Sequence, residues 1–362
     1  MKIYKIHKIR GFTIVEMMIS LVLGALLLGG IISLFTNNHR TYLIIQSTAN
    51  LQDNARFVID VISEDIRMAG YYGCLSKRTD PVYNPSLLQT GLNIDFLFKN
   101  YFLGIKGFEA ASTMAWQPEL PELLTRLNPA PLEGSDIITI KRIVNNGAKL
   151  SSLNESERTM KLVEESLFKK NDVAIISDCE KATLFQISSV NSSGNNQVIQ
   201  YQVNGGTPGN QNIPISTGAS YIPNSSNVYL FASRVYYIAP AWDIVNNQAI
   251  TNNMGKPVFS LWRLQGIDTI GNPLTQELVR GVENLQMTYG VDSSPASPKV
   301  GDDRIDQYLN ADRVDQIDNG FERVIAVKIE LTVNSIDSIG SKNDGVLRKT
   351  LSHIVKIRNR GS

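Results

Sequence analysis

The chain has 362 residues, with 35 basic and 34 acidic side chains and a formal net charge of +1 at pH 7. This balance excludes a strong global attraction to nucleic acids or acidic surfaces. Hydrophobic residues make up 43% of the sequence and charged residues 19%, which excludes a chain that is disordered as a whole. The length allows one large domain or two ordinary ones.

The first distinct segment is a basic leader that precedes a long apolar run. The basic side chains of the leader are Lys2, Lys5, Lys8 and Arg10. The run at 12–35 would form a helix about 36 Å long, enough to cross a bilayer core of about 30 Å. Because the next basic residue is Arg40, the positive-inside rule keeps the leader cytoplasmic and exports the remainder.

Gly11, Phe12 and Glu16 distinguish this segment from an ordinary secretory signal. Such a signal is cleaved at small residues after its apolar core, and no clear A-x-A site follows this run. The natural break lies before the core, at Gly11 and Phe12. A carboxylate in lipid is costly, which makes Glu16 a functional candidate. Cleavage after Gly11 would place Glu16 one helical turn from a new α-amino cation, where an anion is favoured.

The string Gly11-Phe12-Thr13-Ile14-Val15-Glu16, followed by an apolar helix, resembles the class III signal of type IV pilins and type II secretion pseudopilins. In that family a membrane-embedded prepilin peptidase cuts after the glycine and N-methylates the new first residue. The resemblance therefore implies cleavage after Gly11 and an N-methylated Phe12. It also implies that Glu16 sets the register between neighbouring subunits of a filament.

The helical pattern continues beyond the apolar run. From residue 36 to 70 there is no proline, and a stripe of apolar residues recurs at spacings of three and four. Its members are Leu51, Ala55, Val58, Ile62, Ile66 and Ala69. The sequence thus predicts one helix over 12–69, with a membrane half at 12–35 and an exported amphipathic half at 36–70 that carries a folded domain. Gly70 and Gly73 are the expected helix end.

The remainder divides into an irregular part and a β-rich part. Residues 71–135 contain scattered prolines and aromatics and are expected to form a subdomain or insertion, with a short helix near 121–127. From residue 136 to 362 the periodicity changes toward two, which is typical of strands. The expected strands are 136–144, 172–177, 183–190, 197–203, 227–238, 258–264, 284–291, 323–333 and 349–357. The predicted fold is α+β and pilin-like, with an antiparallel sheet packed on the exported half of the helix.

The sequence contains two cysteines, Cys74 and Cys179. Both lie in the part expected outside the cytoplasm, where a sparse, even number of cysteines predicts one disulfide. The alternative is a pair of buried free thiols. The absence of CxxC spacing gives no support to a redox or zinc motif.

Several later motifs resemble the PilW group of large minor pilins. They are Arg67-Met68-Ala69-Gly70-Tyr71-Tyr72-Gly73-Cys74, Gly134-Ser135-Asp136, Ser177-Asp178-Cys179 and the stretch from Gly281 to Asp292. The resemblance implies that Cys74 pairs with Cys179. It also implies a scarce subunit that joins other minor pilins in an initiating complex near the pilus tip. The chain lacks the C-terminal cysteine pair of major pilins, so receptor-binding roles of that loop are not transferred.

Catalytic and cofactor motifs are not found. The histidines His7, His39 and His353 are far apart in sequence, and no HExxH, Walker or GxSxG string occurs. We therefore expect no enzymatic activity and no cofactor. Asp302, Asp303 and Asp306 are weak candidates for a Ca²⁺ site, because they do not match the EF-hand loop, and an exposed polar loop is the simpler interpretation. The basic C-terminal strand is expected to be a solvated edge, and nucleic-acid binding is not expected.

Three hypotheses follow. In the first, the chain is a minor pilin that primes type IV pilus assembly. Its expected partners are prepilin peptidase, other minor pilins, the major pilin, the inner membrane and a tip adhesin. The precursor would span the inner membrane once, with a periplasmic domain, and would become extracellular in the pilus. The alternatives are a type II secretion pseudopilin and an unprocessed, membrane-anchored periplasmic binding protein.

Overall fold

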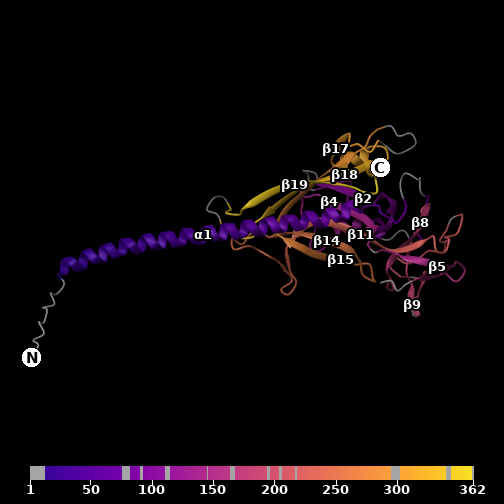
Figure 1. Ribbon diagram of the computed structural model, residues 1–362, viewed down its shortest axis with the longest axis horizontal. Coiled ribbons are helices and arrows are strands. Elements are labelled where there is room, and N and C mark those ends of the chain that lie inside the picture. The colour runs from indigo at the N-terminus through magenta and orange to yellow at the C-terminus, as the bar shows by residue number, and fades with distance from the viewer. Residues whose placement is uncertain are drawn as a thin grey trace, which may run out of the picture.

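A long helix and a β-rich body make up the protein. The computed structural model describes residues 13–75, 82–89, 93–110, 115–144, 146–163, 168–193, 196–203, 206–216, 218–294, 302–339 and 344–360. Figure 1 shows that the helix α1 (Ile14–Arg67) extends far from the body at its N-terminal end and enters the body at its C-terminal end. The predicted continuous helix is therefore confirmed over these residues, and residue 12 lies outside the described part.

Short helices and strands follow α1. The short helices are α2 (Asp95–Phe98), η2 (Tyr101–Leu103), α3 (Glu122–Thr125), α4 (Ala311–Gln316) and η3 (Gly320–Arg323). The first strands are β1 (Val82–Tyr83), β2 (Ile105–Ala110), β3 (Trp116–Gln117), β4 (Ile137–Ile143), β5 (Ala148–Asn154), β6 (Thr159–Val163), β7 (Val173–Ser177), β8 (Lys181–Gln186), β9 (Ser189–Ser193) and β10 (Asn196–Gln200). The later strands are β11 (Asn227–Pro240), β12 (Trp242–Asp243), β13 (Gln248–Ala249), β14 (Phe259–Ile267), β15 (Pro273–Arg280), β16 (Val282–Val291), β17 (Gln307–Leu309), β18 (Val324–Asn334) and β19 (Arg348–Lys356).

Strand β11 connects two groups of strands. Its first residues pair with β5 and β7, which lie with β8, β6, β10 and β9 at the end of the body farthest from the N-terminus. Its later residues pair with β4 on one side and β14 on the other, and β2 and β15 continue that group. A separate antiparallel sheet has the order β17-β16-β18-β19. These pairings confirm the predicted α+β fold, and the short β1–β8 pair is parallel.

Two features differ from the predicted strands. The expected strand at 183–190 is divided into β8 and β9, because Ile187 leaves the ladder and exchanges backbone hydrogen bonds with residues 171 and 172. Nine strands of the described chain were not predicted, namely β1, β2, β3, β5, β6, β12, β13, β15 and β17. Five of them have only two or three residues, and the places of the longer β5, β6 and β15 are decided by pairing with neighbours.

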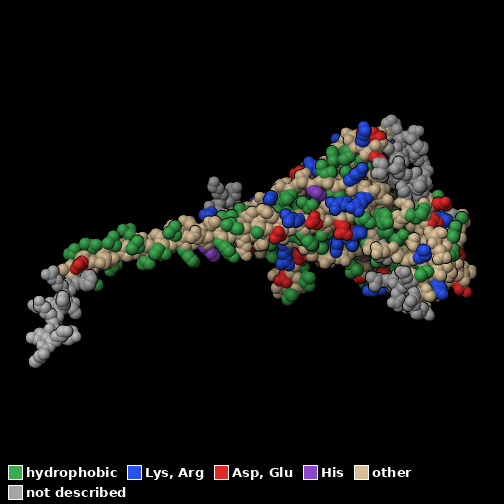
Figure 2. All heavy atoms as spheres, in the orientation of Figure 1, with side chains coloured by type: hydrophobic (Ala, Val, Ile, Leu, Met, Phe, Trp, Pro, Cys, Tyr) green, Lys and Arg blue, Asp and Glu red, His purple; other side chains and the backbone are tan. Residues whose placement is uncertain are grey.

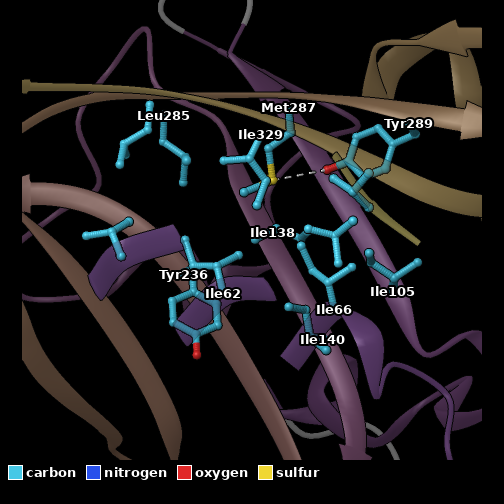
Figure 3. Packing of buried hydrophobic residues seen from close by; sticks show 14 of the residues in the cluster. Ile62, Ile66, Ile105, Ile138, Ile140, Tyr236, Leu285, Met287, Tyr289 and Ile329 are labelled. Carbon is cyan, nitrogen blue, oxygen red and sulfur yellow. Dashed lines mark hydrogen bonds between the residues drawn. The ribbon is translucent and has the colours of Figure 1, made fainter. Parts of the chain in front are cut away.

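The apolar stripe of α1 lies in the main core, between the strands of both sheets. Val58, Ile62 and Ile66 are fully buried against residues of β4, β11, β16 and β18. Figure 3 shows Ile62 and Ile66 beside Ile138, Tyr236 and Met287. Burial of a branched aliphatic side chain contributes roughly 1.5–3 kcal/mol. The C-terminal half of α1 is therefore the element around which the two sheets are assembled.

A buried ion cluster sits on the same part of α1. The Asp65 carboxylate is 1% exposed and lies 2.6 Å from Nη2 of Arg142 on β4 and 2.7 Å from Nη1 of Arg234 on β11. Tyr236 is the third partner, and its hydroxyl donates a hydrogen bond to Asp65 at 2.6 Å. A buried carboxylate is tolerated when it is paired and hydrogen-bonded, and here its partners come from two adjacent strands. The cluster therefore fixes the helix to one position over the sheet.

The C-terminal segment secures the end of α1. The amide of Arg358 donates to the carbonyl of Arg67 at 3.1 Å, and Nδ2 of Asn359 donates to the carbonyl of Gly70 at 2.7 Å. The Arg360 side chain is buried and donates to the carbonyls of Phe321 and Val324. The last residues thus satisfy carbonyls that a helix end leaves without partners.

The disulfide between Cys74 and Cys179 is present, with Cα atoms 4.9 Å apart. It joins the segment after α1 to the turn between β7 and β8, and the hydroxyl of Ser177 donates to the carbonyl of Tyr72 next to it at 2.7 Å. The bond closes a loop with a sequence separation of 105 residues. The expected pairing is confirmed, and it ties the helix end to the distal group of strands.

We predict that Asp65→Asn destabilises the folded protein by about 3–5 kcal/mol, because it removes the buried charge that pairs with Arg142 and Arg234 and leaves Arg142 only the exposed Glu64, 3.7 Å away. The free energy of unfolding would be measured by urea titration of the full chain in detergent micelles. Asp60→Asn is the matched control, since Asp60 is exposed on the same helix. Equal effects of the two substitutions would contradict the role given to the cluster.

We predict that replacing both cysteines by serine lowers the free energy of unfolding by about 2–5 kcal/mol, because the unfolded chain is no longer constrained by the long disulfide loop. The thermal unfolding midpoint of the variant would be compared with that of the unchanged protein, with and without a thiol reductant. The reductant should lower the midpoint of the unchanged protein only. A variant as stable as the oxidised protein would refute this account.

Candidate assembly site

The N-terminal part of α1 has no partner inside this chain. The described chain contains one helix apolar and long enough to cross a membrane, and no residue of its most apolar window is buried. Figure 2 shows this part as a rod covered with hydrophobic side chains. Leu51 is the first residue of α1 that the body buries, so the helix runs about 22 Å beyond Phe35 before it meets the domain. An apolar surface of this size requires lipid or other helices around it.

Thr13 and Glu16 form a capping box at the start of the helix. The amide of Glu16 donates to Oγ1 of Thr13 at 3.2 Å, and Oε2 of Glu16 accepts from the amide of Thr13 at 3.4 Å. This arrangement satisfies amides that the first turn leaves free. The structure thus places the Glu16 carboxylate in the first turn of α1. Gly11 and Phe12 lie outside the described residues.

Three glycines in the apolar rod leave places on its surface that carry no side chain. A Cβ atom added at Gly24, Gly29 or Gly30 would meet nothing within 4 Å. Each glycine inside a helix costs roughly 1 kcal/mol relative to alanine. No contact within the described chain offsets this cost, whereas small residues allow the backbones of neighbouring membrane helices to approach closely. The rod is therefore suited to packing with other helices.

The motif Gly134-Ser135-Asp136 joins the two sheets. The Asp136 carboxylate accepts from the amides of Ala110 at 2.9 Å and Met287 at 2.7 Å, and the hydroxyl of Ser135 lies 3.2 Å from the amide of Leu285. Burial raises the pKa of Asp136 to about 6, and the two amide hydrogen bonds oppose that rise. Burial also raises the pKa of the neighbouring Glu109, to about 7. This motif therefore connects β4 to the stretch from Gly281 to Asp292.

The acidic loop does not form a cluster of carboxylates. Oδ2 of Asp306 accepts hydrogen bonds from the amide and hydroxyl of Ser293, at 2.7 and 2.9 Å, which lower the pKa of Asp306. Oδ1 of Asp302 accepts from the amide of Arg304, and the amide of Asp303 donates to Asp292. Among the residues that the structure describes, no group of three or more metal-binding side chains is brought together. The carboxylates of Asp302 and Asp306 stabilise the loop backbone.

The basic C-terminus is only partly a solvated edge. Arg348 forms ion pairs with Glu283 and Asp344, both at 2.6 Å, and Lys349 is exposed. Arg360, in contrast, is 3% exposed, which corrects the expectation that all these residues face solvent. Burial lowers the pKa of Arg360 to about 10. The reason for the difference is tertiary, because the segment after β19 turns back over the end of α1.

The Asp65 cluster was missed in the sequence analysis. Asp65 follows Leu51 and Val58 at spacings of seven residues, so it occupies the buried stripe of the helix rather than its polar face. An acidic residue at such a position predicts a buried partner. The identity of the partners, Arg142 and Arg234, could not be read from the sequence, because they are 77 and 169 residues away.

Comparison with known proteins gives two matches. Residues 6–32 match the family described as the prokaryotic N-terminal methylation motif. Residues 247–352, which contain β13 to β19 up to Ser352, match the family described as type IV pilus-assembly protein W. No curated protein and no solved structure matches the chain.

The two matched regions lie at the two ends of one architecture. The first contains the capping box and the beginning of the apolar rod, and the second supplies the sheet that packs on the C-terminal half of α1. Together they indicate a structural component of the pilus. The two matches support a minor pilin of the type IV pilus that is similar to the pilus-assembly protein W family over residues 247–352.

Proposed function

We propose that this minor pilin joins other minor pilins in a complex that initiates pilus assembly and stays near the pilus tip. The observation that carries the proposal is the exposed apolar rod with its single acidic cap, attached to a large folded body. A body of this size exceeds what a subunit of a repetitive shaft needs. It offers specific faces to a small number of partners, which fits a subunit used once per filament. The role is structural rather than catalytic.

Processing creates the positively charged amino terminus with which a Glu16 carboxylate can pair. In the precursor the leader is cytoplasmic, the rod spans the inner membrane and the body is periplasmic. Prepilin peptidase cuts after Gly11, and Phe12 becomes an N-methylated amino terminus that carries a positive charge. Glu16 lies one turn further along the helix, at its N-terminus. After processing, each subunit thus bears a cation and an anion close together at one end of an apolar rod.

The Glu16 carboxylate and the new amino terminus then determine how neighbouring subunits align. A carboxylate is poorly solvated in lipid, and its free energy falls when a neighbouring subunit brings its amino terminus within hydrogen-bond distance. Glycines on the rod allow the helices to approach, and contact with the major pilin follows the same geometry. The bodies remain outside the bundle, where they contact other minor pilins and, at the tip, an adhesin. Assembly moves the protein from the inner membrane to the cell surface.

We predict that the native protein begins at N-methyl-Phe12 and that Gly11→Leu leaves the leader attached, because the branched side chain does not fit a site that accepts glycine. Intact-mass analysis of the protein from its own cells distinguishes the two forms. Gly30→Leu, at a helical glycine outside the signal where an added Cβ would meet nothing within 4 Å, is the control and should be processed normally. A native protein that still carries its leader would exclude the pilin mechanism.

We predict that Glu16→Ala is processed normally but fails to restore pili in a deletion strain, because the neighbour's amino terminus loses its counter-charge. Pili would be counted by electron microscopy, and twitching motility measured in parallel. The control is Asp53→Ala, which removes an exposed carboxylate from the same helix. Normal piliation with Glu16→Ala would contradict the proposed register. Loss of protein secretion with intact pili on deletion would assign the chain to a type II secretion system.

A further inference from the structure

A cavity opens at the end of the body farthest from the N-terminus. Its volume is about 400 Å³. Its walls come from residues 83–86, 88 and 89, from α2, η2 and the two residues between them, and from Gln211 and Ile213. Strand β1 contributes Tyr83 to the wall and pairs with β8, which Figure 1 places at this end. The volume lies within the range of roughly 300–1,000 Å³ that is usual for small-molecule sites.

Aromatic rings form one wall of the cavity. The ring centroids of Tyr83 and Phe102 are 5.4 Å apart with an interplanar angle of 33°, and Tyr101 contacts Tyr83 edge to face at 5.8 Å. Tyr101 is buried, whereas Tyr83 and Phe102 are only partly buried. These two rings therefore have surface that faces the cavity, while their mutual contacts hold them in place.

The wall is rigid before any ligand arrives. The hydroxyl of Tyr101 lies 2.9 Å from the backbone carbonyl oxygens of both Asn84 and Ala182, and it donates a hydrogen bond to one of them. The Asn84 side chain, which is 2% exposed, donates to the hydroxyl of Thr183 at 2.9 Å. A site whose side chains are already fixed loses little conformational entropy on binding. The hydroxyl of Tyr101 is used in this support, so Tyr101 offers only its ring.

The polar groups of the cavity carry no net charge. Asp95 and Lys99, which α2 brings to the same wall, contribute one negative and one positive charge. The remaining polar side chains include the amides of Gln89, Asn100 and Gln211. Amide groups donate and accept hydrogen bonds, as hydroxyl groups do. This combination disfavours a strongly charged ligand and matches a neutral, hydroxylated one.

We propose that this distal cavity binds a neutral pyranose sugar. One face of a pyranose ring presents C–H groups, which pack on the electron-rich face of an aromatic ring, and its rim presents hydroxyl groups that amides can bind. Phe102 and Tyr83 supply the aromatic surface, and Asn100 supplies an exposed amide at the rim. The cavity holds one or two rings. The proposal does not rest on the assembly role, because the cavity is remote from the apolar rod.

The test is saturation-transfer NMR on the full chain in nanodiscs made of lipids without sugar headgroups. The neutral probes are methyl β-D-glucopyranoside, methyl β-D-galactopyranoside and N,N′-diacetylchitobiose, and glucuronate is the charged probe of similar size. We expect saturation transfer to at least one neutral pyranoside and a several-fold weaker signal for glucuronate. The chitobiose distinguishes a polymer of amino sugars from glycans built of simple hexoses, and binding of either supports the proposal.

Variants test that the saturation-transfer signal arises from binding in the cavity. Phe102→Leu keeps an apolar side chain but removes the ring and should weaken binding about tenfold, whereas Phe102→Tyr should retain it. Asn100→Gly removes the rim amide and preserves the left-handed backbone at φ 49°, and it should weaken binding several-fold. Tyr308→Leu, at an exposed ring on β17, is the control and should change nothing. Circular dichroism verifies the fold of each variant.

Two results would overturn the proposal. The first is the absence of saturation transfer to every neutral pyranoside. The second is binding that neither Phe102→Leu nor Asn100→Gly weakens, and Asn100→Gly alone decides if the Phe102 variant does not fold.

Discussion

A single buried carboxylate fixes the relation between the helix and the body. Asp65 faces the sheet from the buried stripe of α1 and meets two guanidinium groups from adjacent strands. Apolar packing alone would allow the helix to slide or rotate with little change in buried area. The Asp65 carboxylate pairs with both guanidinium groups in this position of α1, and an unpaired charge in the interior is costly. The cluster therefore fixes the C-terminal half of α1 with respect to β4 and β11.

This constraint matters because α1 is continuous. The same helix that the body holds at residues 51–66 extends through an exposed segment to the apolar rod. A displacement of the helix in the body would therefore move the rod with it. The disulfide and the C-terminal contacts of Arg358 and Asn359 hold the other end of the helix. Forces that act on the rod in a filament are thus transmitted to the body through covalent and ionic connections.

The body is built in two parts with different tasks. The sheet β17-β16-β18-β19, together with β4, β11 and β14, surrounds α1. The distal strands around β7 and β8 extend away from it and present the cavity with its aromatic wall. Strand β11 passes through both parts, and Asp136 joins the first part to β16. The part that holds the helix and the distal part are therefore connected through β11.

Local patterns in the sequence determined the features that depend on near neighbours. The apolar run, the capping pair Thr13 and Glu16, the stripe from Leu51 to Ile66 and the alternation in β18 each depend on residues a few positions apart. Two cysteines alone allowed only one intramolecular disulfide.

The tertiary structure decided what depends on distant partners. It brought Arg142 and Arg234 to Asp65, divided the expected strand at 183–190, buried Arg360 and gathered Tyr83 and Phe102 around a cavity. These contacts join segments that no periodicity relates, because the energy that selects them arises only when the chain is folded.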